Sequence, residues 1–184
     1  MRKGIAAALT ALAAVCAFAA PAVTAGASTA SIHPHVTGHG GPIKEISGSF
    51  CIRDSSGGDP GGQNAIIKEG SCGSGPGENL RWVTNGGSFE GFATGEFHFT
   101  GELTPETCLG INTSNWFQAI PQFCSGVNGV VFIQKPLNGA FQIVSRPGTQ
   151  HQGNADLMLT GQNSANSAFL FGTAGAGFQR FTDF

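Results

Sequence analysis

Short apolar segments separated by turn residues recur along most of the chain. Each mixes β-branched and aromatic residues with polar ones over a few positions, which is typical of short β-strands. Gly, Asn, Ser and Pro lie between the segments and mark turns. The clearest predicted strands are 64–69, 80–84, 88–93, 116–120, 130–134 and 140–145.

The aromatic ends of three such strands are evenly spaced. Trp82, Phe132 and Phe181 lie 50 and 49 residues apart, and both Cys108 to Phe132 and Leu157 to Phe181 span 24 residues. A fixed period of this length indicates a repeat architecture. We therefore expect an all-β chain in which three repeats of about 50 residues form a β-trefoil with these aromatics at its core. The alternative is a β-sandwich of seven or more strands, with the spacing a coincidence. The expected repeats are about 47–103, 104–152 and 153–184.

The last repeat is predicted to lack its fourth strand. In the second repeat the strand 140–145 begins eight residues after Phe132, whereas the chain stops three residues after Phe181. Because an open sheet edge invites pairing with other chains, we expect a segment to cover it. The candidates are the arm 28–46, the segment 95–101 or a strand from a partner.

The N-terminus has the pattern of a secretory signal peptide. Arg2 and Lys3 precede an apolar run, and small residues end it near Ala27. We expect residues 1–27 to be removed, 28–46 to form a flexible arm, and 47–184 to form the domain of a secreted protein with no membrane association after removal of the signal. The arm carries three His residues but no group to orient their rings, so we expect a solvated linker and no metal site.

Four cysteines remain after that cleavage: Cys51, Cys72, Cys108 and Cys124. In an oxidising compartment they predict disulfides, with three possible pairings. Sequential pairing would give two similar loops. The absence of a C-x-x-C pair disfavours a metal site.

Composition narrows the class of protein. The 29 Gly residues, the 11% of charged residues and the scarcity of Leu, Met, Lys and Glu disfavour a helical protein. The net charge of −2 disfavours nucleic acid and anionic membranes as partners, because both require clustered cations.

The chain resembles the ricin-type β-trefoil lectin family. The resemblance is carried by Cys51 with Cys72, by 78–82 at the position of the Gln-x-Trp signature, and more weakly by Cys108 with Cys124 and by 179–181. It implies disulfides Cys51–Cys72 and Cys108–Cys124, core positions for Trp82, Phe132 and Phe181, and carbohydrate recognition without a cofactor.

Several sugar-binding positions of that family are altered. The family's Asp position holds Arg53 in the first repeat, although Asp54 follows, and Gly110 in the second. Asn79 keeps the family's Asn. The absence of Tyr removes a common platform for a sugar ring. The expected ligand-binding residues are Asn112, Trp116 and Gln122, together with Asp54 and Asn79.

Catalytic motifs are not evident. The stretch 54–60 is similar to the serine motif of trypsin-like proteases, but without its partners it indicates a Gly-rich turn. His98 alternates with Phe97 and Phe99 and should face outward. We expect a non-catalytic binding module for glycans. The alternative is a protein-interaction adaptor in a secreted complex, or a hydrolase inhibitor.

Overall fold

The structure is a computed structural model that describes residues 40–56, 65–73, 77–101, 106–124, 128–175 and 178–183. The predicted signal peptide and most of the predicted arm lie outside these residues. Among the residues that are described, no helix is both long enough and apolar enough to cross a membrane.

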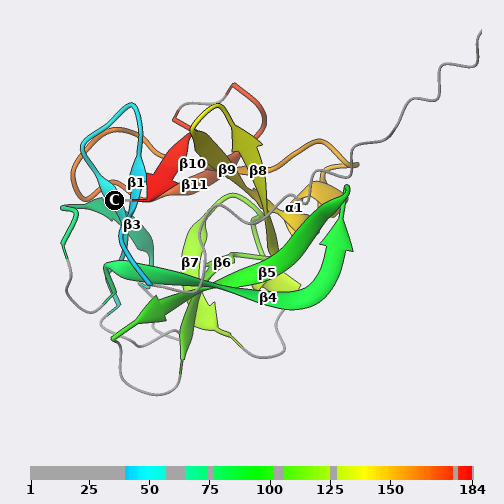
Figure 1. Ribbon diagram of the computed structural model, residues 1–184, viewed down its shortest axis with the longest axis horizontal. Helices are drawn as coiled ribbons and strands as arrows, with labels where there is room; N and C mark the ends of the chain where they lie inside the picture. Colours follow the sequence, from blue (N-terminus) through cyan, green and yellow to red (C-terminus); the bar gives the residue numbers. More distant parts are fainter. Residues whose placement is uncertain are drawn as a thin grey trace, which may run out of the picture. The chain divides into compact units, whose positions relative to one another are not determined.

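Twelve short strands and two short helical segments make up the described chain (Figure 1). In chain order they are β1 (Ile43–Glu45), β2 (Cys51–Asp54), β3 (Ile67–Gly70), β4 (Asn79–Phe89), β5 (Phe92–Thr100), β6 (Thr107–Ile111), β7 (Ala119–Phe123), the 3₁₀ turn η1 (Asn128–Val130), β8 (Phe132–Leu137), β9 (Ala140–Ser145), α1 (Arg146–His151), β10 (Met158–Thr160), β11 (Leu170–Gly172) and β12 (Phe181–Asp183).

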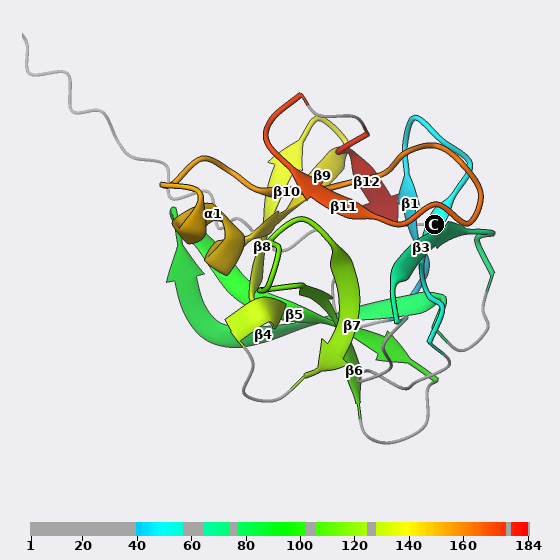
Figure 2. The ribbon, with the colours of Figure 1, turned by 180° about the vertical axis from the view of Figure 1, so that it is seen from behind.

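Six of these strands form a closed ring. Antiparallel pairing runs from β1 through β12, β9, β8 and β5 to β4, and a bridge between Gly41 and Leu80 joins β4 back to the residues before β1. The hairpins β2–β3, β6–β7 and β10–β11 attach to β1, β5 and β9. Neighbouring hairpins also touch, through the bridges Lys68–Ala168 and Gln118–Leu170 (Figure 2). This arrangement, a barrel with three hairpins, is the predicted β-trefoil.

The predicted boundaries of the repeats need correction. Repeats that begin at β1, β5 and β9 each contain four strands, so the last repeat, β9–β12, does not lack one. The strand 140–145, assigned to the end of the second repeat, is β9, the first strand of the third. The error arose because the repeats were started at the first cysteine of each unit, which leaves out the preceding barrel strand.

The strand beside β12 comes from the expected arm. Ile43, Lys44 and Glu45 pair with Asp183, Thr182 and Phe181. The described part of the arm therefore contains a barrel strand, and the domain extends N-terminally beyond residue 47. The other candidate segment, 95–101, lies in and directly after β5, which pairs with β4, β6 and β8.

The hairpin β4–β5 is longer than its sequence pattern predicted. The expected separate strand 88–93 is instead the end of this hairpin, with the last residues of β4, the first of β5 and, between them, a turn in which Glu90 and Gly91 have φ angles of 52° and 81°. The tip folds back onto the barrel: Phe89 and Phe92 pack against Ile133, Val144 and Met158.

The core confirms the aromatic pattern. Trp82, Phe132 and Phe181 are 4%, 0% and 0% exposed and belong to one apolar cluster. Ring contacts extend it: Trp82 meets Phe97 edge-on at 4.8 Å, and Phe169 lies 6.1 Å from Phe181. The described disulfides, Cys51–Cys72 and Cys108–Cys124, are the sequential pairs. Each closes a short loop of the type that adds about 2–4 kcal/mol of stability.

Candidate functional site

Trp116 lies in the loop between β6 and β7, in a backbone conformation that is unusual for an aromatic residue. Its φ angle is 61°, in the left-handed region. Hydrogen bonds hold the loop in place. Asn112 accepts a bond at its backbone oxygen from the Trp116 amide, 2.7 Å away, and one at its side-chain oxygen from the Ser114 amide. Asn115 accepts a bond from the amide of Phe117. Such left-handed residues cost about 1–3 kcal/mol and cluster at functional sites.

The indole of Trp116 stacks on a side chain from the third repeat. Its ring centroid lies 4.4 Å from that of His151, with an angle of 11° between the ring planes. His151 ends α1, which begins after Ser145; the Ser145 hydroxyl accepts a hydrogen bond from the amide of Gly148. Trp116 also packs against the apolar core. The stack therefore joins the β6–β7 loop to α1.

A pocket with a cavity volume of about 460 Å³ opens beside this stack. It is lined by Trp116, Val131, Arg146, Pro147, Gln150 and His151. Rings and apolar side chains form one part of the lining, and a guanidinium and an amide supply hydrogen-bond donors. None of these lining residues is acidic. A combination of ring edges with a few polar groups suits a small polar ligand, above all one with an acceptor-rich or anionic group.

The other predicted site residues of the second repeat do not line this pocket. Asn112 builds the loop that positions Trp116. Gln122 lies in β7 and donates a hydrogen bond to the backbone oxygen of Ile111. Its side chain packs directly against two glycines, Gly110 and Gly129. A Cβ added at Gly110 would lie 2.7 Å from Cδ of Gln122, and one added at Gly129 would lie 2.6 Å from its Oε1. Gln122 thus fills the space beside the position where the resembled family has its Asp.

Asp54 and Asn79, in the first repeat, lie outside the lining of the pocket as well. Asp54 is 4% exposed and accepts hydrogen bonds from both the amide and the hydroxyl of Ser56. Asn79 is the first residue of β4 and pairs with Thr100. Asp54 is therefore engaged by the turn that follows β2.

Sequence reasoning missed Arg146, Gln150 and His151. One local signal was available, because Ser145 followed closely by Pro147 is typical of a helix start. No local pattern, however, indicates that α1 packs beside a loop some 35 residues earlier. That contact depends on the closure of the barrel.

Comparisons with known proteins support the fold. A designed three-fold symmetric protein, ThreeFoil, superposes with a TM-score of 0.58 at 12% sequence identity, covering 77% of this chain and 94% of that one. A likeness at this identity establishes the β-trefoil fold alone. No protein-family model matches the chain, and no curated protein matches it.

Proposed function

We propose that the protein is a secreted, non-catalytic recognition module that binds glycans in the pocket beside Trp116. The observation that carries this proposal is the pocket itself, where the Trp116–His151 stack adjoins Arg146 and Gln150. Sugar recognition combines an apolar ring contact with hydrogen bonds to hydroxyl groups, and these side chains offer both. Secretion is inferred from the N-terminal signal pattern, and no cofactor is required.

Kinship with the ricin-type lectins is a second element of the proposal. It is supported by the two disulfides and by Gln179, the Gln of the sequence Gln-x-Phe. The Gln179 side chain donates hydrogen bonds to Thr160 and to the backbone oxygens of Gly172 and Thr173, and it accepts one from the Gly175 amide. Gln179 therefore has a structural role within its repeat. Such a role would allow the Gln of the signature to be kept even where the sugar-binding positions of the family are altered.

The proposed binding mode differs from the one that the resemblance implies. Gln122 occupies the space beside Gly110, and Asp54 is bonded to its own turn. The ligand would instead lie between the β6–β7 loop and α1. His151 already covers one face of the indole, so the sugar would contact the edge of the stack or displace the imidazole.

A glycan array probed with the full chain tests this proposal. We expect binding to a defined set of glycans, and loss of about 5- to 150-fold in affinity for Trp116→Ala, which corresponds to about 1–3 kcal/mol. Phe117→Ala is the matched control, because Phe117 is 53% exposed and does not line the pocket. An array without a hit, beside a pull-down with one dominant secreted partner, would overturn the glycan proposal.

A protein-interaction function is the second candidate, as an adaptor in a secreted complex or a hydrolase inhibitor. It is favoured by two exposed apolar side chains on adjoining hairpins. Phe117 is 53% and Leu170 is 38% exposed. The backbones of their two segments are joined, because the Phe171 amide donates a 2.6 Å hydrogen bond to the Phe117 backbone oxygen. The double variant Phe117→Ser with Leu170→Ser should abolish a protein contact here and leave glycan binding unchanged.

A further inference from the structure

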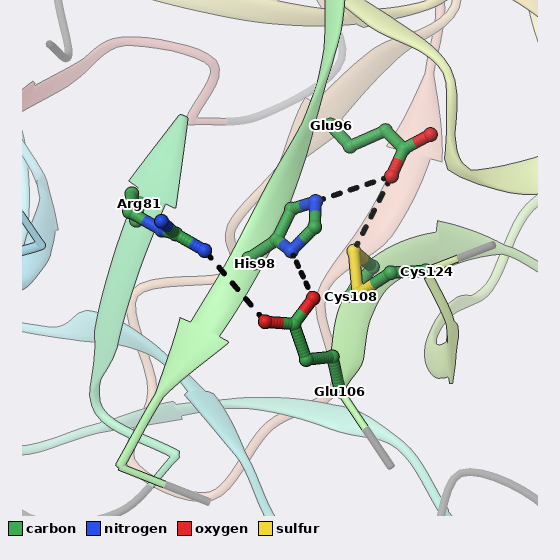
Figure 3. The surroundings of a disulfide bond; sticks show 6 residues. All are labelled: Arg81, Glu96, His98, Glu106, Cys108 and Cys124. Carbon is green, nitrogen blue, oxygen red and sulfur yellow. Dashed lines mark hydrogen bonds and ion pairs between the residues drawn. A yellow bond between two sulfur atoms is a disulfide. The ribbon is translucent and has the colours of Figure 1, made fainter. Parts of the chain in front are cut away.

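The face of β5 that points away from the core carries a buried histidine. Phe97 and Phe99 belong to the core, as the alternating pattern predicted. His98 points the other way, as the same pattern predicted, but it is only 7% exposed. It is covered because Glu106 and the Cys108–Cys124 disulfide lie over this face of the strand (Figure 3).

Each ring nitrogen of His98 faces a carboxylate. Nε2 lies 3.2 Å from Oε2 of Glu96, and Nδ1 lies 3.2 Å from Oε2 of Glu106 (Figure 3). The other oxygen of Glu106 lies 3.7 Å from the Arg81 guanidinium. The imidazole is therefore held in one orientation by two acids, and one of those acids is held by a cation.

The Cys108–Cys124 disulfide lies beside the carboxylate of Glu96, which also faces His98. Sγ of Cys108 is 3.9 Å from Oε2 of Glu96, the oxygen that also faces Nε2 of His98 (Figure 3). The ligand atoms of His98, Cys108 and Cys124 all lie within 4.8 Å of one another. Sulfur, imidazole nitrogen and carboxylate oxygen are the atoms that Zn²⁺ binds in proteins.

Two of the distances between the proposed ligand atoms are close to those of a tetrahedral zinc centre. With Zn–S bonds of about 2.3 Å and Zn–N and Zn–O bonds of about 2.0–2.2 Å, neighbouring ligand atoms lie about 3.3–3.8 Å apart. The distances from Oε2 of Glu96 to Nε2 of His98 and to Sγ of Cys108, 3.2 and 3.9 Å, are already close to that range. The two sulfur atoms, which are bonded to each other, must separate to form the site.

We propose that reduction of Cys108–Cys124 converts this cluster into a Zn²⁺ site formed by Cys108, Cys124, His98 and Glu96. A dithiol reductant supplies two electrons and two protons: the S–S bond of the protein breaks, two thiols form, and the reductant becomes a disulfide. Zn²⁺ then binds both sulfurs as thiolates and releases two protons to solvent. The oxidised protein has no thiolate to offer and does not form the site.

Glu106 and Arg81 are positioning residues for this site. A histidine that binds a metal almost always donates its other ring N–H to a carboxylate, a backbone carbonyl or a water, which fixes the ring and its tautomer. Nδ1 of His98 has that partner in Glu106, leaving Nε2 on the side of Glu96 and Cys108. The Glu106 side chain is 62% exposed, so reductant and metal can approach the buried cluster from its side.

The second disulfide is an internal control. Cys51 and Cys72 are not part of any comparable group of metal-binding side chains within the described residues. A double substitution at Cys51 and Cys72 therefore removes two cysteines and leaves the proposed site intact. The same substitution at Cys108 and Cys124 removes the site and leaves the other disulfide.

Cobalt titration of the full chain tests the proposal, because Co²⁺ bound by thiolate in a tetrahedral site gives characteristic charge-transfer and visible bands. After reduction by a dithiol and its removal without oxygen, we expect one Co²⁺ per chain, displaced by Zn²⁺, and no bands for the oxidised chain. Cys51→Ser with Cys72→Ser should keep these bands, whereas Cys108→Ser with Cys124→Ser should lose them. Equal bands in both double variants, or none in the reduced chain, would overturn the proposal.

Substitutions at the histidine and its partner separate a built site from chelation by unfolded cysteines. In the Cys51→Ser, Cys72→Ser background, His98→Gln should weaken Zn²⁺ binding by at least about tenfold, and Glu106→Gln by about 10- to 100-fold. Protection of Cys108 and Cys124 from alkylation by Zn²⁺ provides a second readout that needs no spectroscopic signal. Unchanged affinity in both variants would mean that the two thiols bind the metal without the cluster, contrary to the proposal.

Discussion

Glu45 and Glu69 are both fully buried, and the negative charge of Glu69 acts on Glu45 across the interior between β1 and β3. Their surroundings differ. Oε1 of Glu45 accepts a hydrogen bond from the amide of Ser47, while its Oε2 has no partner within the described residues. Burial raises the pKa of Glu45 above its ordinary value of 4.5; the bond from Ser47 opposes that rise, and repulsion by Glu69 adds to it.

Glu45→Gln should therefore stabilise the protein near neutral pH. Because the folded-state pKa of Glu45 is raised, its contribution to stability is fully present below the unfolded-state pKa and is lost as pH rises through the folded-state pKa. The glutamine removes that loss, so the advantage of the variant should appear above about pH 5 and vanish below about pH 4. Urea unfolding of both proteins across this range measures it. An advantage that does not depend on pH would contradict the explanation.

Glu69→Ala should be strongly destabilising. The Glu69 carboxylate accepts hydrogen bonds from the amides of Gln162, Asn163 and Ser164, and so holds the loop between β10 and β11 against β3. Removing it leaves these donors without their partner, at a cost of about 2–4 kcal/mol. Glu69→Gln, which keeps an acceptor oxygen, should cost less. Urea unfolding gives the free energies, and amide exchange at 162–164 should accelerate in the alanine variant; equal losses in both variants would exclude this role.

Substitution of two isoleucines, one at the start of β1 and one just after its end, tests whether β1 closes the barrel. Ile43 is 1% exposed in the core, whereas Ile46, just beyond the strand, is 38% exposed. Ile43→Ala should lower the free energy of unfolding by about 2–5 kcal/mol, and Ile46→Ala by less than about 1 kcal/mol. A chain that begins at Gly40 should fold, and one that begins at Ser47 should not. Folding of the shorter chain, seen as retained near-ultraviolet circular dichroism, would show that β1 is dispensable.

Arg146 should make the proposed pocket prefer acidic glycans. The Arg146 guanidinium lines the pocket and carries a positive charge at neutral pH, whereas no acidic side chain lines the pocket. A hydrogen bond to a charged group contributes about 1.5–3 kcal/mol, so Arg146→Gln should weaken binding of a carboxylated or sulfated glycan by about 10- to 100-fold and of its neutral counterpart much less. Calorimetry at two salt concentrations measures both. Arg180→Gln, an exposed cation outside the lining, is the control, and equal effects in the two variants would exclude a direct contact.

The aromatic period was informative because core residues recur wherever the same strand of each repeat enters the barrel. Trp82, Phe132 and Phe181 were identified in this way, and the sequential disulfides were implied by the resemblance to the ricin-type family. The start of the first repeat was not identified, because β1 is only three residues long and directly follows Gly41 and Pro42. Its identity as a strand depends on β12, at the other end of the chain, for its hydrogen bonds.

The predicted binding residues were only partly informative for a related reason. Trp116 was singled out, and it does line the pocket; Gln122 was also chosen, but it fills a space between two glycines. Residue type indicates what a side chain can bind, and only its neighbours determine whether the side chain is free to bind it. Arg146 and His151 come from another repeat, so no spacing around Trp116 indicates them.

The sequence by itself therefore determined the all-β class, the three-part period and the aromatic core, because each depends on patterns within one repeat, and the cysteine pairs were implied by the family resemblance. Tertiary structure alone decided how the barrel closes, which side chains surround Trp116, and that His98 is buried between two carboxylates and a disulfide. The physical reason is that these relationships join segments far apart in the chain. Their energies arise from contacts that exist only once the barrel has formed.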